Sequence, residues 1–329
     1  MSRLVTLPAF LATWAGDDTA RAAVATTVIA IASAGLRIAD MVAQGPLAEH
    51  FAKARGAHAN AGGDTQKELD VIAEDAIVDA LKSAPVAYLG SEESETPIAI
   101  SPNGRLVVAV DPLDGSSNID TNVSIGTIYS ILPYDPDVLP DPNAALMQKG
   151  VAQVAAGFLI YGPSTVLVST LGEGTQVFVH DRVSDAFILA RAAVEIPAET
   201  REYGINQSNM RHWAAPMTAY LTDCLAGADG PRGKDFNMRW VGSMVADAFR
   251  IFTRGGVYLY PGDARKGYGE GRLRLIYEAN PIAFLTEQAK GAATDGVRRI
   301  LDIPPTDLHQ RIPLVFGSRE EVARIAAYH

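Results

Sequence analysis

The segment LVVAVDPLDGSSNID, Leu106–Asp120, carries most of the information about the fold. Its apolar half, Leu106–Val110, indicates a buried strand that ends in a turn. Asp111 and Asp114 therefore stand at the end of a strand, with the backbone carbonyl of Leu113 between them. Hard oxygen ligands gathered in this way are typical of a magnesium or manganese site.

The residues after the carboxylates are small and polar. Gly115, Ser116, Ser117 and Asn118 offer backbone N–H groups and hydroxyls, and such a turn can hold a phosphate group. The same letters also fit an ordinary Asx-rich turn that caps a helix. The following Asn-Ile-Asp favours the phosphate-binding interpretation over the plain turn.

Hydrophobic periodicity on both sides of this segment alternates between helix and strand. We expect helices over Thr19–Val42, Leu69–Leu81, Ala214–Leu225, Ser243–Thr253 and Pro281–Lys290. We expect strands over Val86–Leu89, Leu106–Val110, Gly126–Leu132, Val151–Ile160, Thr165–Ser169, Gln176–Val179, Val257–Tyr260, Leu273–Tyr277 and Leu314–Phe316. The pattern predicts a layered α/β (α+β) protein with two domains, 1–195 and 196–329, and the mixed segment Ile196–Asn209 begins the second.

Composition narrows the class of partner. The chain has 329 residues, 48% of them hydrophobic, and a formal net charge of -10, which disfavours nucleic acid and anionic membranes. The one cysteine, Cys224, excludes an intramolecular disulfide and is expected to be a small core residue. There is no uninterrupted apolar run of about 18 residues, and Pro8 breaks the weak likeness of the N-terminus to a signal peptide. We therefore expect a cytoplasmic protein with no membrane partner.

More carboxylates stand near predicted element ends. Glu92 and Glu93 follow a strand, Asp64 and Asp70 flank the start of a helix, and Glu278 follows the predicted strand Leu273–Tyr277. Taken singly, these are a solvated charge run, a helix N-cap and an exposed strand end. Together with the turn after Asp114 they indicate metal-assisted hydrolysis of a phosphate ester, with one carboxylate left to take the proton of water.

Other chemistries fit poorly. There is no GxxxxGK[ST] loop, no GxSxG turn and no HxxxH spacing, so a P-loop, a serine hydrolase and a zinc site are not indicated. His212 and His309 are interpreted as structural residues.

The sequence contains the motifs DPLDGSSNID, SEE, GDxxxxLD, VGSMVADAFR, LRLIYEANP and PTDLHQRIPLVFGS, which are spread over nearly the whole chain. In these motifs and in their order along the chain, the sequence resembles the class I fructose-1,6-bisphosphatase family. The resemblance implies a layered αβαβα sandwich, a homotetramer, a sugar bisphosphate substrate and Mg²⁺ as cofactor, with Mn²⁺ as the alternative ion. It implies hydrolysis of the 1-phosphate of fructose 1,6-bisphosphate, in gluconeogenesis or the Calvin cycle.

The resemblance also implies roles for individual residues. A pair of magnesium ions would have Glu92, Asp111, the Leu113 carbonyl, Asp114 and Glu278 as ligands. Glu93 and Asp70 would orient and deprotonate the attacking water, and Asp64 would complete a third metal site. The cleaved phosphate would lie on Asp114, Gly115, Ser116 and Ser117. The sugar and the distal phosphate would lie on Asn206, Tyr260 and Arg272, with Tyr258 on the same strand face and Arg239 reaching in from a neighbouring subunit.

The chain departs from the family pattern at the distal end of the site. Arg272 stands where the family usually has lysine, and Trp240 and Asn209 replace tyrosines. We therefore expect a broadened substrate range that includes sedoheptulose 1,7-bisphosphate. The stretch that corresponds to the family's AMP site, Ala15–Ala25, carries two aspartates, and Arg105 with its neighbour replaces a Lys-Tyr pair, so we expect weak or absent AMP inhibition.

Two other functions stay open at this point. One is an inositol- or nucleotide-phosphate phosphatase on the same metal core, which the residues around Asn206, Arg239 and Arg272 disfavour. The other is a sugar-phosphate sensor without catalysis. A sensor should have lost a core carboxylate, and none is missing from the motifs.

Overall fold

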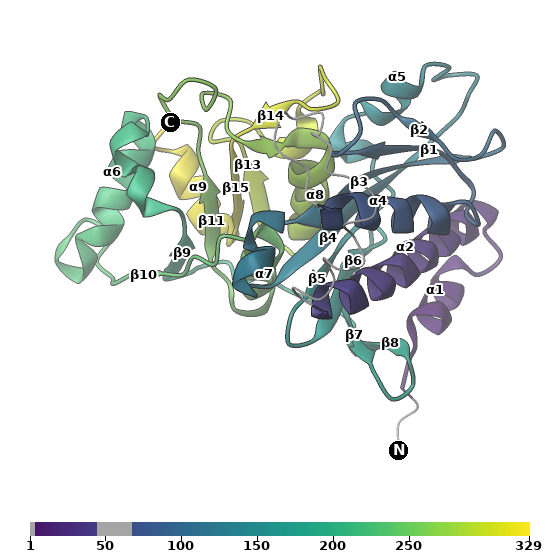
Figure 1. Ribbon diagram of the computed structural model, residues 1–329. Helices are drawn as coiled ribbons and strands as arrows, with labels where there is room; N and C mark the ends of the chain where they lie inside the picture. The colour runs from purple at the N-terminus through teal and green to yellow at the C-terminus, as the bar shows by residue number, and fades with distance from the viewer. Residues whose placement is uncertain (1–3, 45–67) are drawn as a thin grey trace.

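The fold stacks helices and sheets in five alternating layers (Figure 1). A computed structural model describes residues 4–44 and 68–329. From the N-terminal side, the layers are a group of helices, an eight-stranded sheet, two helices, a five-stranded sheet and two outer helices. This is the predicted layered α/β sandwich.

The large sheet supplies the frame on which the site is built. Its strand order is β2-β1-β3-β4-β5-β6-β7-β8; β1 and β3 are parallel, and the other neighbours are antiparallel. The strands are β1 (Val86–Ser91), β2 (Ile98–Ala99), β3 (Leu106–Asp114), β4 (Ile125–Pro133), β5 (Ala155–Tyr161), β6 (Thr165–Thr170), β7 (Thr175–Asp181) and β8 (Ala186–Arg191).

Three helices cover one face of this sheet: α1 (Leu7–Ala15), α2 (Thr19–Ala43) and α4 (Glu68–Leu81). By length and composition α2 could cross a membrane, because its most apolar window has a mean hydropathy of 1.7. However, 56% of that window is buried inside the protein, where α2 packs on α1, α4, β5 and β6. These contacts account for its apolar composition.

The middle layer consists of α7 (Met244–Arg254) and α8 (Asn280–Gln288), and it joins the two sheets. Alternate side chains of β4 and β5 point to this side of the large sheet, as the period of a strand requires. Phe158 of β5 meets Phe252 of α7 edge to face, with ring centroids 5.9 Å apart. One apolar cluster therefore includes residues from both halves of the chain.

The smaller sheet has the order β10-β9-β11-β15-β13. Its strands are β9 (Glu202–Gly204), β10 (Asn237–Met238), β11 (Val257–Tyr260), β13 (Ala292–Thr294) and β15 (Leu314–Gly317), and a separate pair joins β12 (Leu273–Arg274) to β14 (Arg311–Ile312). The outer helices are α6 (Ala215–Leu225) and α9 (Arg319–Ala326), and a short α5 (Pro142–Leu146) lies near the large sheet. Cys224 of α6 is buried, as predicted.

Several predicted elements differ from those observed. The predicted strand Leu273–Tyr277 is wrong beyond Arg274, because Leu275–Ala279 forms a π-helix. The first part of the predicted strand Val151–Ile160 is a 3₁₀ turn, and β5 begins only at Ala155. No helix was predicted at the N-terminus, where the sequence has a weak likeness to a signal peptide. This segment forms α1, with Leu7 and Leu11 in the core.

Candidate metal and phosphate site

A bulge in β3 brings the two aspartates of the DPLDG motif onto one side. β3 pairs with β4 in regular register up to Asp111 opposite Ile128, and the register then shifts before Asp114 meets Gly126. Thr127 fills the gap, because its hydroxyl donates to the carbonyl oxygen of Pro112 at 2.7 Å. Both carboxylates thus face the same cavity from the end of a buried strand.

Glu278 joins the two aspartates from a segment far along the chain. Single oxygen atoms of Asp111, Asp114 and Glu278 all lie within 4.8 Å of one another. All three side chains are buried. The π-helix Leu275–Ala279 positions Glu278, and the backbone N–H of Arg274 donates to its carboxylate. The short π-helix is a rare element that is found most often at functional sites.

The electrostatics of this cluster show charge that the protein alone does not balance. Burial, and then the nearby carboxylates led by Glu92, raise the pKa of Asp111 well above its usual range. Burial is also the main cause that raises the pKa of Asp114 to about 7 and the pKa of Glu278 well above normal. Clustered carboxylates whose charges repel in a buried site are suited to a divalent cation with oxygen ligands.

Glu92 and Glu93 follow β1, whose parallel pairing with β3 sets them beside Asp111. The backbone N–H of Glu92 donates to the carbonyl oxygen of Val110 at 3.1 Å. Both glutamates line the same cavity as the aspartates, and so does Asp70 of α4, which is 4% exposed. The cavity has a volume of 460 Å³. Asp64 lies outside the described residues.

The turn after Asp114 has the backbone shape that the motif predicts. Gly115 has a φ of 77°, and a Cβ atom there would lie 3.0 Å from the hydroxyl oxygen of Ser243, so a larger residue fits poorly. Ser116 and Ser117 begin a 3₁₀ helix, Ser116–Thr121, and line the cavity. The backbone of α7 fixes Asp114 from the other side, because the N–H of Val245 donates to its carboxylate at 2.9 Å.

A second cavity of 200 Å³ adjoins the first. Tyr260 and Arg272 line both cavities, and Asn206 and Asn209 line the second. Tyr258 lies beneath Tyr260, with ring centroids 6.3 Å apart, which confirms the shared strand face. The structure places Tyr258 in the core rather than on a cavity wall, with 2% of its surface exposed.

Two residues of the predicted distal site lie elsewhere. Trp240 stacks on Tyr258 at 5.5 Å and does not line the second cavity. Arg239 does not line either cavity, and its guanidinium lies 3.8 Å from the carboxylate of Glu202. Within this chain, therefore, Arg239 is not brought to the site.

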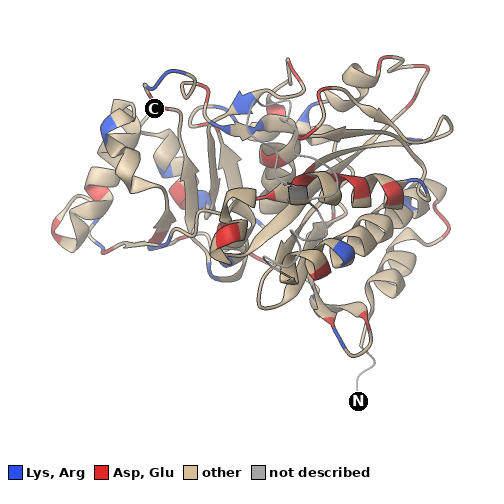
Figure 2. Ribbon diagram, viewed as in Figure 1, with Lys and Arg blue, Asp and Glu red and all other residues tan. Residues whose placement is uncertain are grey.

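Sequence reasoning missed several residues of the site, most of them basic. Arg274 is buried and its Nε lies 3.2 Å from Glu92, so it stands among the carboxylates. Arg311 reaches the same cavity because β14 pairs with β12, Arg274 opposite Arg311. Arg265 and Tyr268 line the second cavity. In Figure 2 basic positions gather around β14, and acidic positions follow α4.

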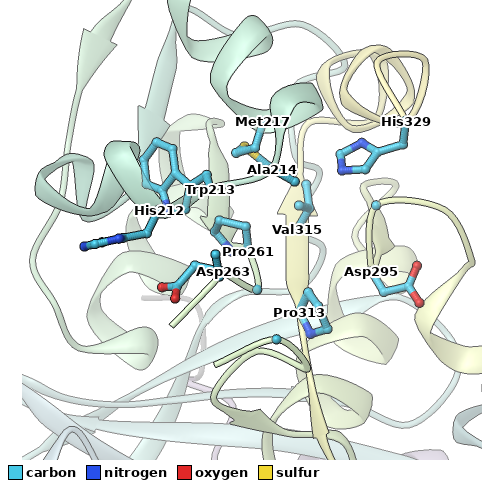
Figure 3. A pocket seen from close by; sticks show the side chains of 14 residues that line it. His212, Trp213, Ala214, Met217, Pro261, Asp263, Asp295, Pro313, Val315 and His329 are labelled. Atoms are coloured by element: carbon cyan, nitrogen blue, oxygen red, sulfur yellow. The ribbon is translucent and has the colours of Figure 1, made fainter. Parts of the chain in front are cut away.

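A third cavity of 390 Å³ lies behind the loop that carries Asp263 (Figure 3). Its wall is largely apolar, with Trp213, Met217 and Val315 among its residues. His212 is at its rim in Figure 3, and His309 is elsewhere, within hydrogen-bonding distance of the carbonyl oxygen of Ser94. This cavity holds none of the predicted site residues.

Buried carboxylates beside a glycine-serine turn, on this five-layer fold, agree with comparisons to known proteins. Family models match "Fructose-1-6-bisphosphatase, N-terminal domain" over residues 6–192 and "Fructose-1-6-bisphosphatase, C-terminal domain" over residues 196–329. The chain belongs to the fructose-1,6-bisphosphatase family.

Curated relatives place it within class 1, and a solved structure shares its fold. It is 74% identical to a class 1 fructose-1,6-bisphosphatase of Azorhizobium caulinodans, with 99% of each chain covered. It is 72% identical to one of Xanthobacter autotrophicus, with both chains fully covered. The holo form of Leishmania major fructose-1,6-bisphosphatase superposes with a TM-score of 0.90 at 35% identity, covering 99% of each chain. The family and the fold predicted from the sequence are confirmed.

Proposed function

We propose that this enzyme hydrolyses the 1-phosphate of fructose 1,6-bisphosphate to fructose 6-phosphate and phosphate. One observation carries the proposal: three buried carboxylates within 4.8 Å of one another share a cavity with the Gly115–Ser117 turn. Tyr260 and Arg272 connect that cavity to a second one. A substrate with a phosphate at each end fits this pair of cavities.

The cluster of carboxylates fits a divalent cation, and we assign Mg²⁺, with Mn²⁺ as the alternative. The ligands would be Glu92, Asp111, the Leu113 carbonyl, Asp114 and Glu278, and the raised carboxyl pKa values reflect charge that a cation would balance. A bound cation would neutralise the phosphoryl oxygens and the leaving alkoxide and favour hydroxide formation from water at neutral pH.

Other residues would handle the phosphate and the water. The backbone N–H groups and hydroxyls of Gly115, Ser116 and Ser117 would hold the phosphate that is cleaved. Glu93 and Asp70 line the same cavity as the three-carboxylate cluster, and we assign them to orient the water and take its proton. We assign Asp64 to a third metal position.

The second cavity would bind the sugar and the distal phosphate through Asn206, Tyr260 and Arg272, with Tyr258 supporting Tyr260 from below. Arg239, which lines neither cavity of its own chain, would complete the site of a neighbouring subunit in a homotetramer. We place the enzyme in the cytoplasm, in gluconeogenesis or the Calvin cycle.

We also propose that sedoheptulose 1,7-bisphosphate is a substrate. Asn209 lines the second cavity and Trp240 does not, which leaves room beside the sugar. The test is kcat/KM on both bisphosphates. A preference for fructose 1,6-bisphosphate of about a thousandfold would contradict a broadened range.

The main activity is tested by release of phosphate from fructose 1,6-bisphosphate, with Mg²⁺ and after chelation by EDTA. We expect release only with the cation, and its loss in Asp114→Asn. Asp137→Asn is a matched control, because Asp137 is exposed and does not line the cavity. Faster release from an inositol monophosphate or a nucleotide monophosphate would point instead to the other phosphatases with this kind of metal core.

A further inference from the structure

The loop between β11 and β12 presents two guanidinium groups over one aromatic ring. The Cζ atom of Arg265 lies 4.3 Å from the centroid of the Tyr268 ring, and that of Arg272 lies 4.9 Å from it. The Tyr268 hydroxyl also accepts a hydrogen bond from Nη1 of Arg272 at 3.2 Å. All three residues line the second cavity, so the ring and both cations face one space.

Bonds within the loop fix this arrangement before any ligand binds. The carboxylate of Asp263 accepts from both Nε and Nη2 of Arg265 in a fork. Asp263 is 9% exposed, and its backbone N–H donates to the carbonyl oxygen of Tyr268 at 3.0 Å. The N–H of Tyr268 donates in turn to the carbonyl oxygen of Arg265 at 3.0 Å. Asp263, labelled in Figure 3, lines both the second and the third cavity.

These bonds leave donors of both arginines for another acceptor. A guanidinium carries five N–H donors. Among residues 4–44 and 68–329, Nη1 of Arg265 and Nη2 of Arg272 have no hydrogen-bond partner. Of the described residues that line this cavity, Asp263 is the one carboxylate, and the fork to Arg265 engages it. The wall therefore suits a dianion such as a phosphate monoester.

We propose that Arg265 binds the distal phosphate of the substrate directly and that Tyr268 is the positioning residue that aims Arg272 at the same group. The inference rests on the proposed function and names two specificity-determining residues for it. Two pre-oriented guanidinium groups would bind the terminal oxygens of a phosphate group more tightly than one mobile cation would.

The experiment compares fructose 1,6-bisphosphate with fructose 1-phosphate, which lacks the distal group. The variants are Arg265→Gln and Tyr268→Leu, with Tyr268→Phe to separate the hydroxyl from the ring. We expect Arg265→Gln and Tyr268→Leu to raise KM for the bisphosphate about tenfold or more, with a smaller change in kcat. The ratio of kcat/KM between the two substrates should fall by the same factor, which damage to the fold would not produce.

Lys266→Gln is the control, because Lys266 is an exposed cation of the same loop that lines none of the three cavities. An equal loss on both substrates, an unchanged KM in both variants, or the same effect from Lys266→Gln would overturn the inference and leave the proposed function standing. A wild-type enzyme that releases no phosphate from fructose 1,6-bisphosphate would overturn the proposed function, and this inference with it.

Discussion

At the scale of single residues, the site buries carboxylates whose ionised form the protein alone stabilises poorly. Asp111, Asp114 and Glu278 are buried within a few ångströms of one another, and Arg274, a buried cation that lines the same cavity, pairs with Glu92. Such an arrangement costs folding free energy without a bound cation and favours binding of one. Stability and metal binding should therefore respond in opposite directions when one acid is neutralised.

Glu278→Gln tests that opposition. The amide keeps an oxygen that can accept the N–H of Arg274 but removes one buried charge. We expect phosphate release to fall about 100-fold or more, because a proposed metal ligand is lost. We also expect the melting temperature in EDTA at pH 8 to rise. A melting temperature that falls in EDTA would show that the buried charge is not a destabilising feature.

The raised carboxyl pKa values predict how stability depends on pH. Burial raises the pKa of Asp114 to about 7, whereas an aspartate of an unfolded chain titrates near pH ~4. Between these values the folded, metal-free protein holds a proton that the unfolded chain has lost, so its unfolding free energy falls as pH rises through this window. Melting curves in EDTA from pH 5 to pH 8 measure this fall.

A proton bound to a carboxylate of this cluster competes with the cation for the same oxygen atoms. The apparent Kd for Mg²⁺ should fall by up to about tenfold per pH unit for each proton displaced, until the window is passed. Titration calorimetry at several pH values measures it, and two buffers of different ionisation enthalpy count the released protons. A Kd that does not vary with pH would contradict protonation of this cluster.

At the scale of elements, β4 carries a glycine that the neighbouring strand requires. A Cβ atom on Gly126 would lie 2.0 Å from the carbonyl oxygen of Leu159 in β5 and 2.9 Å from a methyl group of Val245. Because Gly126 also pairs with Asp114, any shift of β4 reaches the carboxylate cluster.

Gly126→Ala should therefore lower the unfolding free energy by about 3 kcal/mol and reduce phosphate release. Urea denaturation measures the first quantity. Gly269→Ala is the control for stability, since a Cβ atom there would meet no atom within 4 Å. If Gly126→Ala is as stable as the wild type, the strands have room to separate and the close approach is not a constraint.

The N-terminus of α2 bears on regulation by AMP. The Asp18 carboxylate accepts the N–H groups of Ala20 and Arg21 at 2.8 and 3.1 Å, which occupies donors that a nucleotide phosphate would need. We expect AMP at micromolar concentrations to leave phosphate release unchanged. Asp18→Gly should not restore inhibition if Asp17 also repels the phosphate. Strong inhibition of the wild type by AMP would contradict the expectation.

Elements were predicted well where a periodic segment was long. The prediction failed where contacts with the rest of the protein determine the local structure. The long helices and the strands β1 and β3 to β7 of the large sheet were predicted from hydrophobic spacing, whereas β2 and β8 were not predicted. The π-helix that carries Glu278 could not be predicted, because its apolar run also fits a strand and only the surrounding core selects the helix. β9 and β13 are three residues each, too short for a periodic signal.

The candidate site divides in the same way. Motif spacing brought attention to Asp111, Asp114 and Glu92, which share a cavity. Arg274 was not predicted as a site residue, because the sequence around a basic residue next to an apolar run does not indicate that it will be buried against Glu92. Arg265 and Tyr268 were not predicted either, because their proposed role depends on a loop conformation that no sequence motif describes.

At the scale of the whole molecule, the middle helices make the two halves depend on each other. The apolar cluster around α7 and α8 takes residues from β4, β5 and β6 as well as from β11, β13 and β15. Each half also has an apolar cluster of its own, one under the helices of the large sheet and one between the small sheet and its outer helices. The division into 1–195 and 196–329 stays a prediction, and the shared cluster links its two parts. Both halves should unfold together.

Phe252→Ala tests this coupling. Removing the ring that packs on Phe158 should lower the unfolding free energy by about 3–5 kcal/mol. The transition should remain single when followed separately by Trp14 of the first half and by Trp213 and Trp240 of the second, using Trp→Phe variants to isolate each signal. Two separated transitions would show that the halves fold independently.

The distance in sequence between the acids also has a bearing on how long the protein survives. Asp111 and Glu278 belong to different halves, so an unfolded chain cannot gather them around an ion. Free Mg²⁺ would thus act as a ligand of the native state alone, and each tenfold excess over its Kd would add about 1.4 kcal/mol against unfolding and proteolytic turnover. The supply of this ion would then set the abundance of the enzyme as well as its rate.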